Sequence, residues 1–456
     1  MVKILIVSHD VVDERMAGPG IRYWELARVL AREFQVTLAA PEHTTLTDKD
    51  LEVVAYPLGQ MEVLAGAARR ADVVLAYGYA VRQLSFLTDI ATPWIADVYV
   101  PELTETLAWQ ANVPLSQREK NYQGILHALE PLARRADFFI CASERQRDFW
   151  LGLLAAYGRV NPRAFSKDPS LRCLVDVVPF GLPSTPPRHR QAVLKGIWPG
   201  IQADDRVILW GGGLWDWLDP LTLLKAVAHV VKLQPKTRLV FPGTRHPNVQ
   251  QIPDMAVRRQ VETLAAELNL EAHVFMGDWL PYTERENYLL EADIGVSLHS
   301  DTVETRFAFR TRILDYIWAG LPMVVTSGDS LSEFVSRYGL GEVVPPNDPH
   351  AVAAALLQLL DTQNLRESYR EQFEQVRAEF TWEQASEPII RFCRAPSLTP
   401  DRQTTTEPAD VDILFSPASE LEAEVVRLRA LVAAYEDGRF MRFMRQVHNW
   451  REKVGI

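Results

Sequence analysis

The chain has 456 residues, of which 47% are hydrophobic and 23% charged, with a formal net charge of −11 at pH 7. This length predicts two or three domains, and the acidic balance argues against a broad nucleic-acid-binding surface. The three cysteines, Cys141, Cys173 and Cys393, match no metal-ligand spacing, which favours reduced thiols in a cytoplasmic protein. Neither a secretory signal peptide nor an apolar run of about 18 residues is recognisable, so we expect any membrane contact to be peripheral.

Short apolar strands alternate with helical segments through residues 1–181. The first helix is expected at 20–34, where apolar residues recur at helical spacing. This βαβ rhythm predicts a parallel sheet with helices on both faces. The predicted strands are 3–8, 35–41, 71–77, 93–99, 136–143 and 175–181.

A stretch rich in proline and polar residues begins the interdomain linker that we expect at 182–200. The same rhythm restarts in 201–379 and predicts a second α/β domain. Two such halves form a cleft, and ligands of parallel sheets lie at the carboxyl ends of the strands. The predicted strands of this half are 206–210, 237–243, 272–278, 292–299, 322–328 and 341–346.

The C-terminal segment differs in composition from the two halves. Residues 395–418 are rich in proline and threonine, which predicts a disordered linker. Residues 419–435 place Leu421 and Leu428 seven apart, a weak coiled-coil pattern that favours a homodimer. Residues 439–456 combine Phe, Met and Val on one face with Arg and Lys on the other. Such a helix is typical of a peripheral membrane anchor, although it could equally dock on the protein itself.

Three glycines, Gly211, Gly212 and Gly213, end the first strand of the second half. Asp219 and Pro220 follow as the expected N-cap and first position of a helix. Glycines let the backbone approach a ligand, and a helix N-terminus attracts anions, so the pattern is compatible with a phosphate cradle. A tight turn without a ligand would use the same residues.

Several stretches together resemble the retaining family 4 (group 1) glycosyltransferases, whose GT-B architecture has two facing Rossmann-like domains. The resemblance covers about residues 1–395 and is carried by "KILIVSHD…MAGPGIRYWELARVL", "VDVVPFGLP", "RLVFPG", "VFMGDWLPYTERENYLLEADIGVSL" and "RILDYIWAGLPMVVTSGD". Residues 380–394 resemble the closing helix that returns to the first domain. The resemblance implies transfer of a sugar, with retention, from a nucleotide-diphosphate sugar co-substrate, without metal or other cofactor. Catalysis would depend on electrostatic stabilisation of the leaving diphosphate.

The chain departs from the family pattern at two places. Family members often carry an arginine and a lysine after the first strand of the donor domain, but "GGGLWDWLDPL" has no cation. The family also often shows two glutamates spaced by seven residues. Here the second acid is Asp315, which would bind the ribose, and the first position holds Phe307. Glu304 could replace the missing acid.

Replacement cations stand close to Asp315. Arg310 and Arg312 flank Thr311 at the expected start of a helix, and guanidinium groups suit a diphosphate. Arg245, on the loop after another strand, is a third candidate. The alternative for each arginine is a salt bridge at a surface or between domains.

Acceptor-side candidates come from the first half. Gly18 and Gly20 open the first helix, and retaining members often place such a loop near the diphosphate and the acceptor. Asp97 stands where many members have a histidine near the reacting centre, so we expect it to be catalytic; otherwise it caps the next segment. His9 is a weaker candidate, and His299 could contact the donor or be structural.

Two tryptophans flank an acid after the three glycines. Trp215 and Trp217 could stack on a base or a sugar, although packing is the more common role of such residues. Asp216 between them could bind a sugar hydroxyl.

We therefore expect a glycosyltransferase that builds a cell-surface polysaccharide or glycolipid at the inner face of the membrane. Its partners would be a nucleotide-sugar donor and a glycan or lipid-linked acceptor. A sugar-nucleotide 2-epimerase and a non-catalytic glycosyltransferase-like scaffold are the alternatives. A dinucleotide-dependent dehydrogenase is disfavoured, because the first strand and its glycines are too widely separated for the usual turn.

Overall fold

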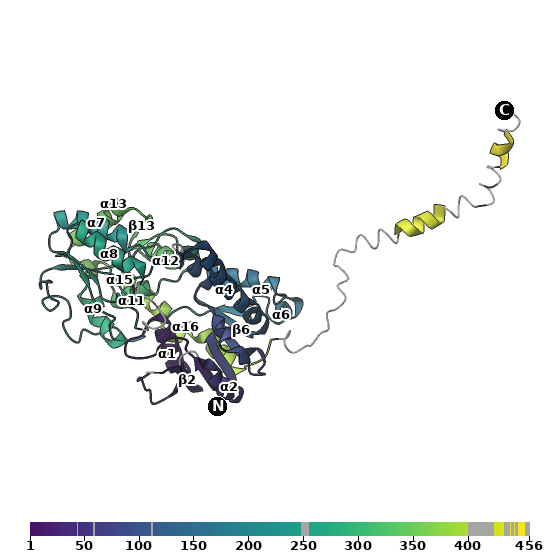
Figure 1. Cartoon of the computed structure of the whole chain (residues 1–456), viewed down its shortest axis with the longest axis horizontal. Helices are drawn as coiled ribbons and strands as arrows, with labels where there is room; N and C mark the ends of the chain where they lie inside the picture. Colours follow the sequence, from purple (N-terminus) through teal and green to yellow (C-terminus); the bar gives the residue numbers. More distant parts are fainter. Residues whose placement is uncertain are drawn as a thin grey trace. The chain divides into compact units, whose positions relative to one another are not determined.

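The computed structural model describes residues 1–456 except 43, 58–59, 111–112, 248–254, 400–423, 433–437, 439–441, 443–445 and 452–456. The chain divides into two compact units, Met1–Gln403 and Thr404–Ile456. The first unit contains both α/β halves, and Figure 1 shows them as a purple-to-blue part and a teal-to-green part.

The N-terminal half is built on a parallel sheet with the strand order β3-β2-β1-β4-β5-β6-β7. Its central strands are buried along their length, as expected of strands covered on both faces. The sequence analysis missed β3, whose half-exposed residues at the sheet edge give only a weak apolar pattern. The strands are β1 (Lys3–Val7), β2 (Gln35–Pro41), β3 (Glu52–Tyr56), β4 (Val73–Tyr77), β5 (Trp94–Asp97), β6 (Phe138–Cys141) and β7 (Val175–Val177).

The C-terminal half repeats this design with a parallel sheet of order β10-β9-β8-β11-β12-β13. The predicted fold class, α/β with two Rossmann-like domains, is confirmed. The strands are β8 (Arg206–Leu209), β9 (Thr237–Phe241), β10 (Val274–Met276), β11 (Ile294–Ser297), β12 (Met323–Thr326) and β13 (Gly341–Val344).

Helices connect the strands in both halves, and several begin at side-chain caps. Ser143, Asp219, Asp329 and Asp348 each accept a hydrogen bond from an amide in the first turn of the helix that follows. The helices of the N-terminal half are α1 (Gly18–Leu30), α2 (Ala65–Arg70), α3 (Glu102–Trp109), α4 (Leu115–Arg135), α5 (Glu144–Ala156) and α6 (Pro162–Lys167). Those of the C-terminal half are α7 (Pro220–Leu233), α8 (Ala256–Glu267), α9 (Arg285–Glu291), α10 (Val303–Phe307), α11 (Thr311–Ala319), α12 (Ser330–Tyr338), α13 (Pro349–Asp361), α14 (Leu365–Ser368) and α15 (Arg370–Arg377).

The chain then crosses back to the N-terminal half through α16 (Trp382–Ala385) and α17 (Glu387–Arg394). Trp382 packs on Phe180, with ring centroids 4.8 Å apart, and its indole fills the space where a side chain at Gly181 would stand. In Figure 1 the green α16 lies beside the purple α1. The ion pair of Arg32, just beyond the end of α1, with Glu383 of α16, at 2.8 Å, joins the same two segments.

The start of the predicted disordered linker is ordered, which corrects the expectation for 395–399. Thr399 is buried, and its amide donates a hydrogen bond to Asp137 at 2.9 Å. Arg159 donates to the Thr399 hydroxyl at 3.1 Å. The polar composition of this segment was therefore a poor indicator of disorder, because buried partners form hydrogen bonds with Thr399.

Most of the C-terminal predictions fall outside the described residues. The structure does not describe the rest of the 395–418 linker, or large parts of 419–435 and 439–456. The described residues 424–432 and 446–451 are helical. Among the residues that the structure describes, no helix is both long enough and apolar enough to cross a membrane.

A buried ion pair fixes α1 against the sheet of the N-terminal half. The Arg22 guanidinium donates to both carboxylate oxygens of Asp97, at 2.6 and 3.1 Å, and neither side chain is exposed. It also donates to the carbonyls of Val178 and Pro179, at 3.0 and 3.1 Å, and lies 4.6 Å from the centroid of the Tyr99 ring. One arginine thus joins α1, the end of β5 and the strand that leads into the linker.

We expect Asp97→Asn to lower the free energy of unfolding of the N-terminal half by about 3–5 kcal/mol, because it leaves the Arg22 charge buried without its counter-ion. The double variant Arg22→Met with Asp97→Leu removes both charges and should be more stable than the single variant. Urea unfolding followed by tryptophan fluorescence measures both. Unchanged stability of Asp97→Asn would show that the ion pair does not hold α1.

Candidate active site

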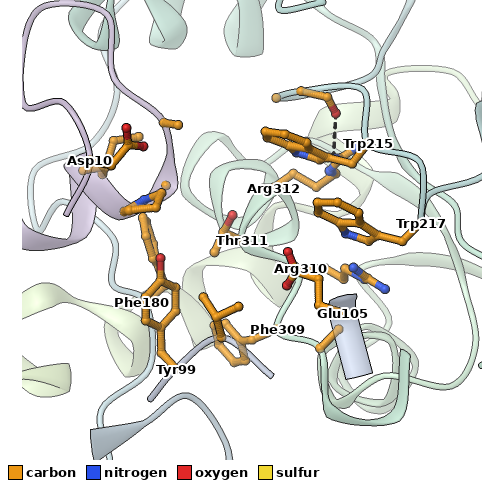
Figure 2. Close-up of a pocket in the computed structure, with 18 of the residues that line it drawn as sticks. Asp10, Tyr99, Glu105, Phe180, Trp215, Trp217, Phe309, Arg310, Thr311 and Arg312 are labelled. Carbon is orange, nitrogen blue, oxygen red and sulfur yellow. Dashed lines mark hydrogen bonds between the residues drawn. The ribbon is translucent and has the colours of Figure 1, made fainter. Parts of the chain in front are cut away.

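A cavity of about 520 Å³ lies between the two halves, where the carboxyl ends of both sets of strands meet. Residues of α1 and α3 line one side, and residues of the glycine loop, α9 and α11 line the other. Figure 2 shows Asp10 and Tyr99 across the cavity from the tryptophans and arginines of the C-terminal half. The candidates that line it are His9, Gly18, Gly211, Gly212, Gly213, Trp215, Trp217, Glu304, Arg310, Thr311, Arg312 and Asp315.

The three glycines line the cavity, but they do not lead directly into a helix. Gly212 has φ +80°, a left-handed conformation that favours glycine, and a side chain there would meet open space. The Gly211 amide donates to the Tyr316 hydroxyl at 2.8 Å and is therefore already engaged. Helix α7 starts only at Pro220, so the helix N-terminus that faces the cavity on this side belongs to α11.

The arginines that precede and open α11 differ in their partners. Arg310 forms an ion pair with Glu304 at 2.6 Å, and both side chains are buried. Arg312 donates from Nη2 to the Gly213 carbonyl at 3.1 Å and lies 4.6 Å from the Trp210 ring centroid. Its buried Nη1 has no hydrogen-bond partner within the described residues. Burial and the neighbouring Arg310 lower the pKa of Arg312 to about 10, so the guanidinium stays charged at neutral pH.

Asp315 lines the cavity from α11 and is oriented by an arginine that the sequence analysis did not single out. Arg285 donates to Asp315 at 3.3 Å, and its guanidinium lies 3.7 Å from the Tyr282 ring centroid. The Tyr282 hydroxyl donates to Glu25 of α1 at 3.0 Å. The side chain that we expect to bind ribose is therefore connected to the N-terminal half. A basic residue at the first position of a helix was the only sequence signal for Arg285.

The wall contributed by the N-terminal half carries carboxyl groups that the sequence analysis also missed. Glu105 of α3 lines the cavity, and burial, Glu102 and Glu304 together raise its pKa to about 8. Glu102 accepts a hydrogen bond from the Tyr77 hydroxyl. His9 stacks on Tyr77 with ring centroids 4.2 Å apart, and burial lowers its pKa to about 4, so the imidazole is neutral.

Four predicted site residues are absent from the cavity lining: Arg245, which is described below, and Asp97, Gly20 and Asp216. Asp97 is fully buried in its ion pair with Arg22, so the predicted catalytic role is wrong. Gly20 is buried beneath the loop between β1 and α1. A side chain there would clash with the Val11 carbonyl, so the role of Gly20 is close packing. Asp216 accepts from the Val257 amide at 2.8 Å in the first turn of α8, which makes it a helix cap rather than a sugar ligand.

Two further candidates lie beside the site. Arg245 lines a small neighbouring hollow together with Thr244, and it is absent from the lining of the main cavity. His299 is buried, and its Nε2 lies 2.9 Å from Asp329, so it supports the loops behind the site. Trp215 and Trp217 do line the cavity, and their rings stack on each other at 5.2 Å, as Figure 2 shows. Among the described residues, no cluster of three or more His, Cys, Asp or Glu side chains could hold a metal ion.

Comparisons with known proteins agree with this geometry. Residues 199–376 match the model of the family described as glycosyl transferases group 1. No curated protein sequence matches the chain. The C-terminal half is thus a group 1 glycosyltransferase domain.

Solved structures of similar fold extend over both halves. Sucrose-phosphate synthase from Thermosynechococcus elongatus is 18% identical, with a TM-score of 0.60 over 86% of this chain and 98% of that chain. HepE from Anabaena in complex with UDP and glucose is 15% identical, with a TM-score of 0.61 over 87% and 100%. WaaG, a glycosyltransferase involved in lipopolysaccharide biosynthesis, is 15% identical, with a TM-score of 0.58 over 86% and 100%. These structures share the two-domain architecture of this chain, the GT-B fold, and residues 199–376 match the group 1 glycosyltransferase model.

The raised pKa of Glu105 predicts a pH-dependent stability. The stabilising contribution of the protonated carboxyl is complete below the ordinary pKa of 4.5 and is lost as the pH rises through about 8. Glu105→Gln should therefore leave the melting temperature nearly unchanged at pH 5 and raise it at pH 9. Glu130→Gln, which removes an exposed carboxylate of α4, is the control. A variant that is no more stable at pH 9 than the parent protein would contradict the assignment.

Proposed function

We propose that the protein transfers a sugar, with retention at the anomeric carbon, from a nucleoside diphosphate sugar to a polysaccharide or glycolipid precursor. The donor would bind against the C-terminal half and the acceptor against the N-terminal half. The resemblance to retaining group 1 enzymes supports the stereochemistry. The complex of HepE with UDP and glucose, a protein of similar fold, supports a donor of the nucleoside diphosphate sugar class.

The unpaired Nη1 of Arg312 carries the donor part of the proposal. A buried guanidinium N–H without a partner is costly, and a diphosphate oxygen would satisfy it. The start of α11, at Thr311, lines the same cavity, and a helix N-terminus adds positive partial charge. Arg312, Thr311 and the backbone of Gly212 and Gly213 then replace the arginine and lysine that the family often uses.

Asp315 and Gly18 would contact different parts of the bound donor. Asp315 is suited to accept hydrogen bonds from the ribose hydroxyls. Gly18 lies at the N-terminus of α1, and open space surrounds the position of a side chain there. This space would let the diphosphate and the sugar approach the α1 amides.

The reaction needs one bond to form and one to break. The acceptor hydroxyl oxygen bonds to the anomeric carbon while the bond from that carbon to the diphosphate oxygen breaks. The acceptor proton passes to the departing diphosphate, whose negative charge Arg312 and the α11 N-terminus stabilise. The cavity holds both substrates in place for this exchange.

We expect Arg312→Ala to weaken nucleoside diphosphate binding by about tenfold to a hundredfold, the loss of one charge-assisted hydrogen bond. Nucleoside binding should change little, because the guanidinium is assigned to the phosphates. Calorimetric titration of UDP, GDP and dTDP, and of the matching nucleosides, measures both. Equal losses for nucleoside and diphosphate would show that Arg312 is structural.

Arg310 provides a contrast within the same segment. Because Glu304 already neutralises it, Arg310→Gln combined with Glu304→Gln removes the pair without leaving a buried charge. The double variant should lose less diphosphate affinity than Arg312→Ala. A larger loss would transfer the main phosphate role to Arg310.

We further propose that the enzyme works at the cytoplasmic face of the membrane in cell-envelope glycan synthesis, anchored by residues 439–456. Each cation near an anionic surface contributes about 1 kcal/mol, and salt screens it. The full chain should sediment with phosphatidylserine vesicles at low salt, and a chain ending at residue 438 should not. Transfer to a soluble acceptor should survive the truncation. A full chain that ignores vesicles of every charge would leave 439–456 as a docking or oligomerisation element.

A further inference from the structure

Charge is divided unequally between the two walls of the cavity. The cations that line it, Arg285, Arg310 and Arg312, all come from the C-terminal half. Among the described residues, the lining contributed by the N-terminal half includes no lysine or arginine, and the His9 imidazole is neutral at physiological pH. Asp10, Glu102 and Glu105 supply carboxyl groups on that wall. A substrate seated there therefore meets acids, while a diphosphate on the opposite wall meets arginines.

The helix N-termini of this wall do not reverse its charge. Glu102 and Glu105 occupy the first turn of α3, so carboxyl groups already face the positive end of that helix. Asp10 lines the cavity together with Gly18 at the start of α1. A phosphate near either helix would lie beside a carboxyl group, and wherever that group is ionised the like-charge contact costs several kcal/mol.

Glu105 is the acid of this wall that remains available to a ligand. Glu102 is engaged by the Tyr77 hydroxyl, and Asp10 accepts a hydrogen bond from the Val11 amide at 2.8 Å and lies 3.6 Å from His246. On the opposite wall, Glu304 is engaged by Arg310. No described residue donates a hydrogen bond to Glu105, and Figure 2 shows its side chain reaching into the cavity near Arg310. Tyr99 lines the same wall, and aromatic rings suit the apolar face of a sugar. Protonated or ionised, the Glu105 carboxyl can bind a sugar hydroxyl.

We propose that the acceptor sugar carries no phosphate or carboxylate group, because the described lining of this wall offers no cation to bind one, and that Glu105 binds a hydroxyl of the sugar and, when ionised, excludes anionic sugars. The proposal rests on the proposed function, because it assumes that the donor occupies the arginine side. It narrows the acceptor to an uncharged sugar unit, whether free or at the end of a longer glycan.

The test is a charge series of sugars offered to the full chain saturated with whichever of UDP, GDP or dTDP binds. Glucose, glucuronic acid and glucose 6-phosphate carry zero, one and two negative charges, and the galactose and mannose series repeat the pattern. Measurements are made by ligand-observed NMR at pH 9, where the Glu105 carboxyl is ionised beside Glu102, Glu304, Arg310 and Tyr99. Affinity should fall at least about tenfold from the neutral sugar to its phosphate.

Charge reversal separates selectivity from a structural role. Glu105→Lys should bring the affinity for the sugar phosphate up to or above that for the neutral sugar, and Glu105→Gln should reduce the discrimination without reversing it. Glu130→Lys makes the same charge change on α4, outside the cavity lining, and should keep the parent preference. A structural role for Glu105 would change stability but not this ratio.

The outcomes also distinguish failure of the acceptor proposal from failure of the proposed donor site on which it rests. Failure of all three diphosphates to bind would overturn the donor assignment. Normal diphosphate binding together with equal affinities along every series, undetectable binding included, would overturn the acceptor proposal alone. A sugar phosphate that binds more tightly than its neutral parent would do the same.

Discussion

The ion pair between Arg22 and Asp97 is the constraint on which the arrangement of the N-terminal half depends. Burying two charges is costly unless their remaining hydrogen-bonding groups are satisfied, and here the carbonyls of Val178 and Pro179 accept the other guanidinium protons. The pair therefore sets the distance between α1, the end of β5 and the strand that enters the linker. Because Gly18 begins α1, the same contact places the N-terminus of that helix at the cavity.

The C-terminal half contributes a second fixed point through Tyr316. Its hydroxyl donates toward the carbonyls of Leu209 and Val296, at 3.1 and 2.9 Å, and accepts from the Gly211 amide. This residue ties α11 to the ends of β8 and β11 and fixes the glycine loop beside Arg312. The wall formed by the C-terminal half is consequently an assembly of strand ends and a helix N-terminus held by hydrogen bonds, which suits the proposed stabilisation of charge on a diphosphate.

The two walls of the cavity differ in charge, because the arginines of its described lining all come from the C-terminal half. Under the proposed function, the arginines of the C-terminal half suit a leaving diphosphate. The described lining from the N-terminal half has carboxyl groups but no lysine or arginine, and it suits hydroxyls. The acidic net charge of the chain did not indicate this division, because it averages over the whole surface. Only the folded chain brings Glu105 of α3 opposite Arg310, about two hundred positions later in the sequence, where burial and nearby acids raise the pKa of the glutamate.

The sequence by itself determined the alternation of strands and helices, the two halves and the segment around α11, because apolar periodicity and helix caps are local properties. Gly211, Arg312 and Asp315 could be selected for the same reason, since spacing along one helix decides which residues share its start. The sequence could not determine that Asp97 pairs with Arg22 or that Asp216 accepts a hydrogen bond from the Val257 amide. Nor could it determine that Glu105 and Arg285 line the cavity. Those outcomes depend on partners far away in the chain, and an acid becomes a ligand, a cap or a buried counter-ion only when packing decides which donor it meets.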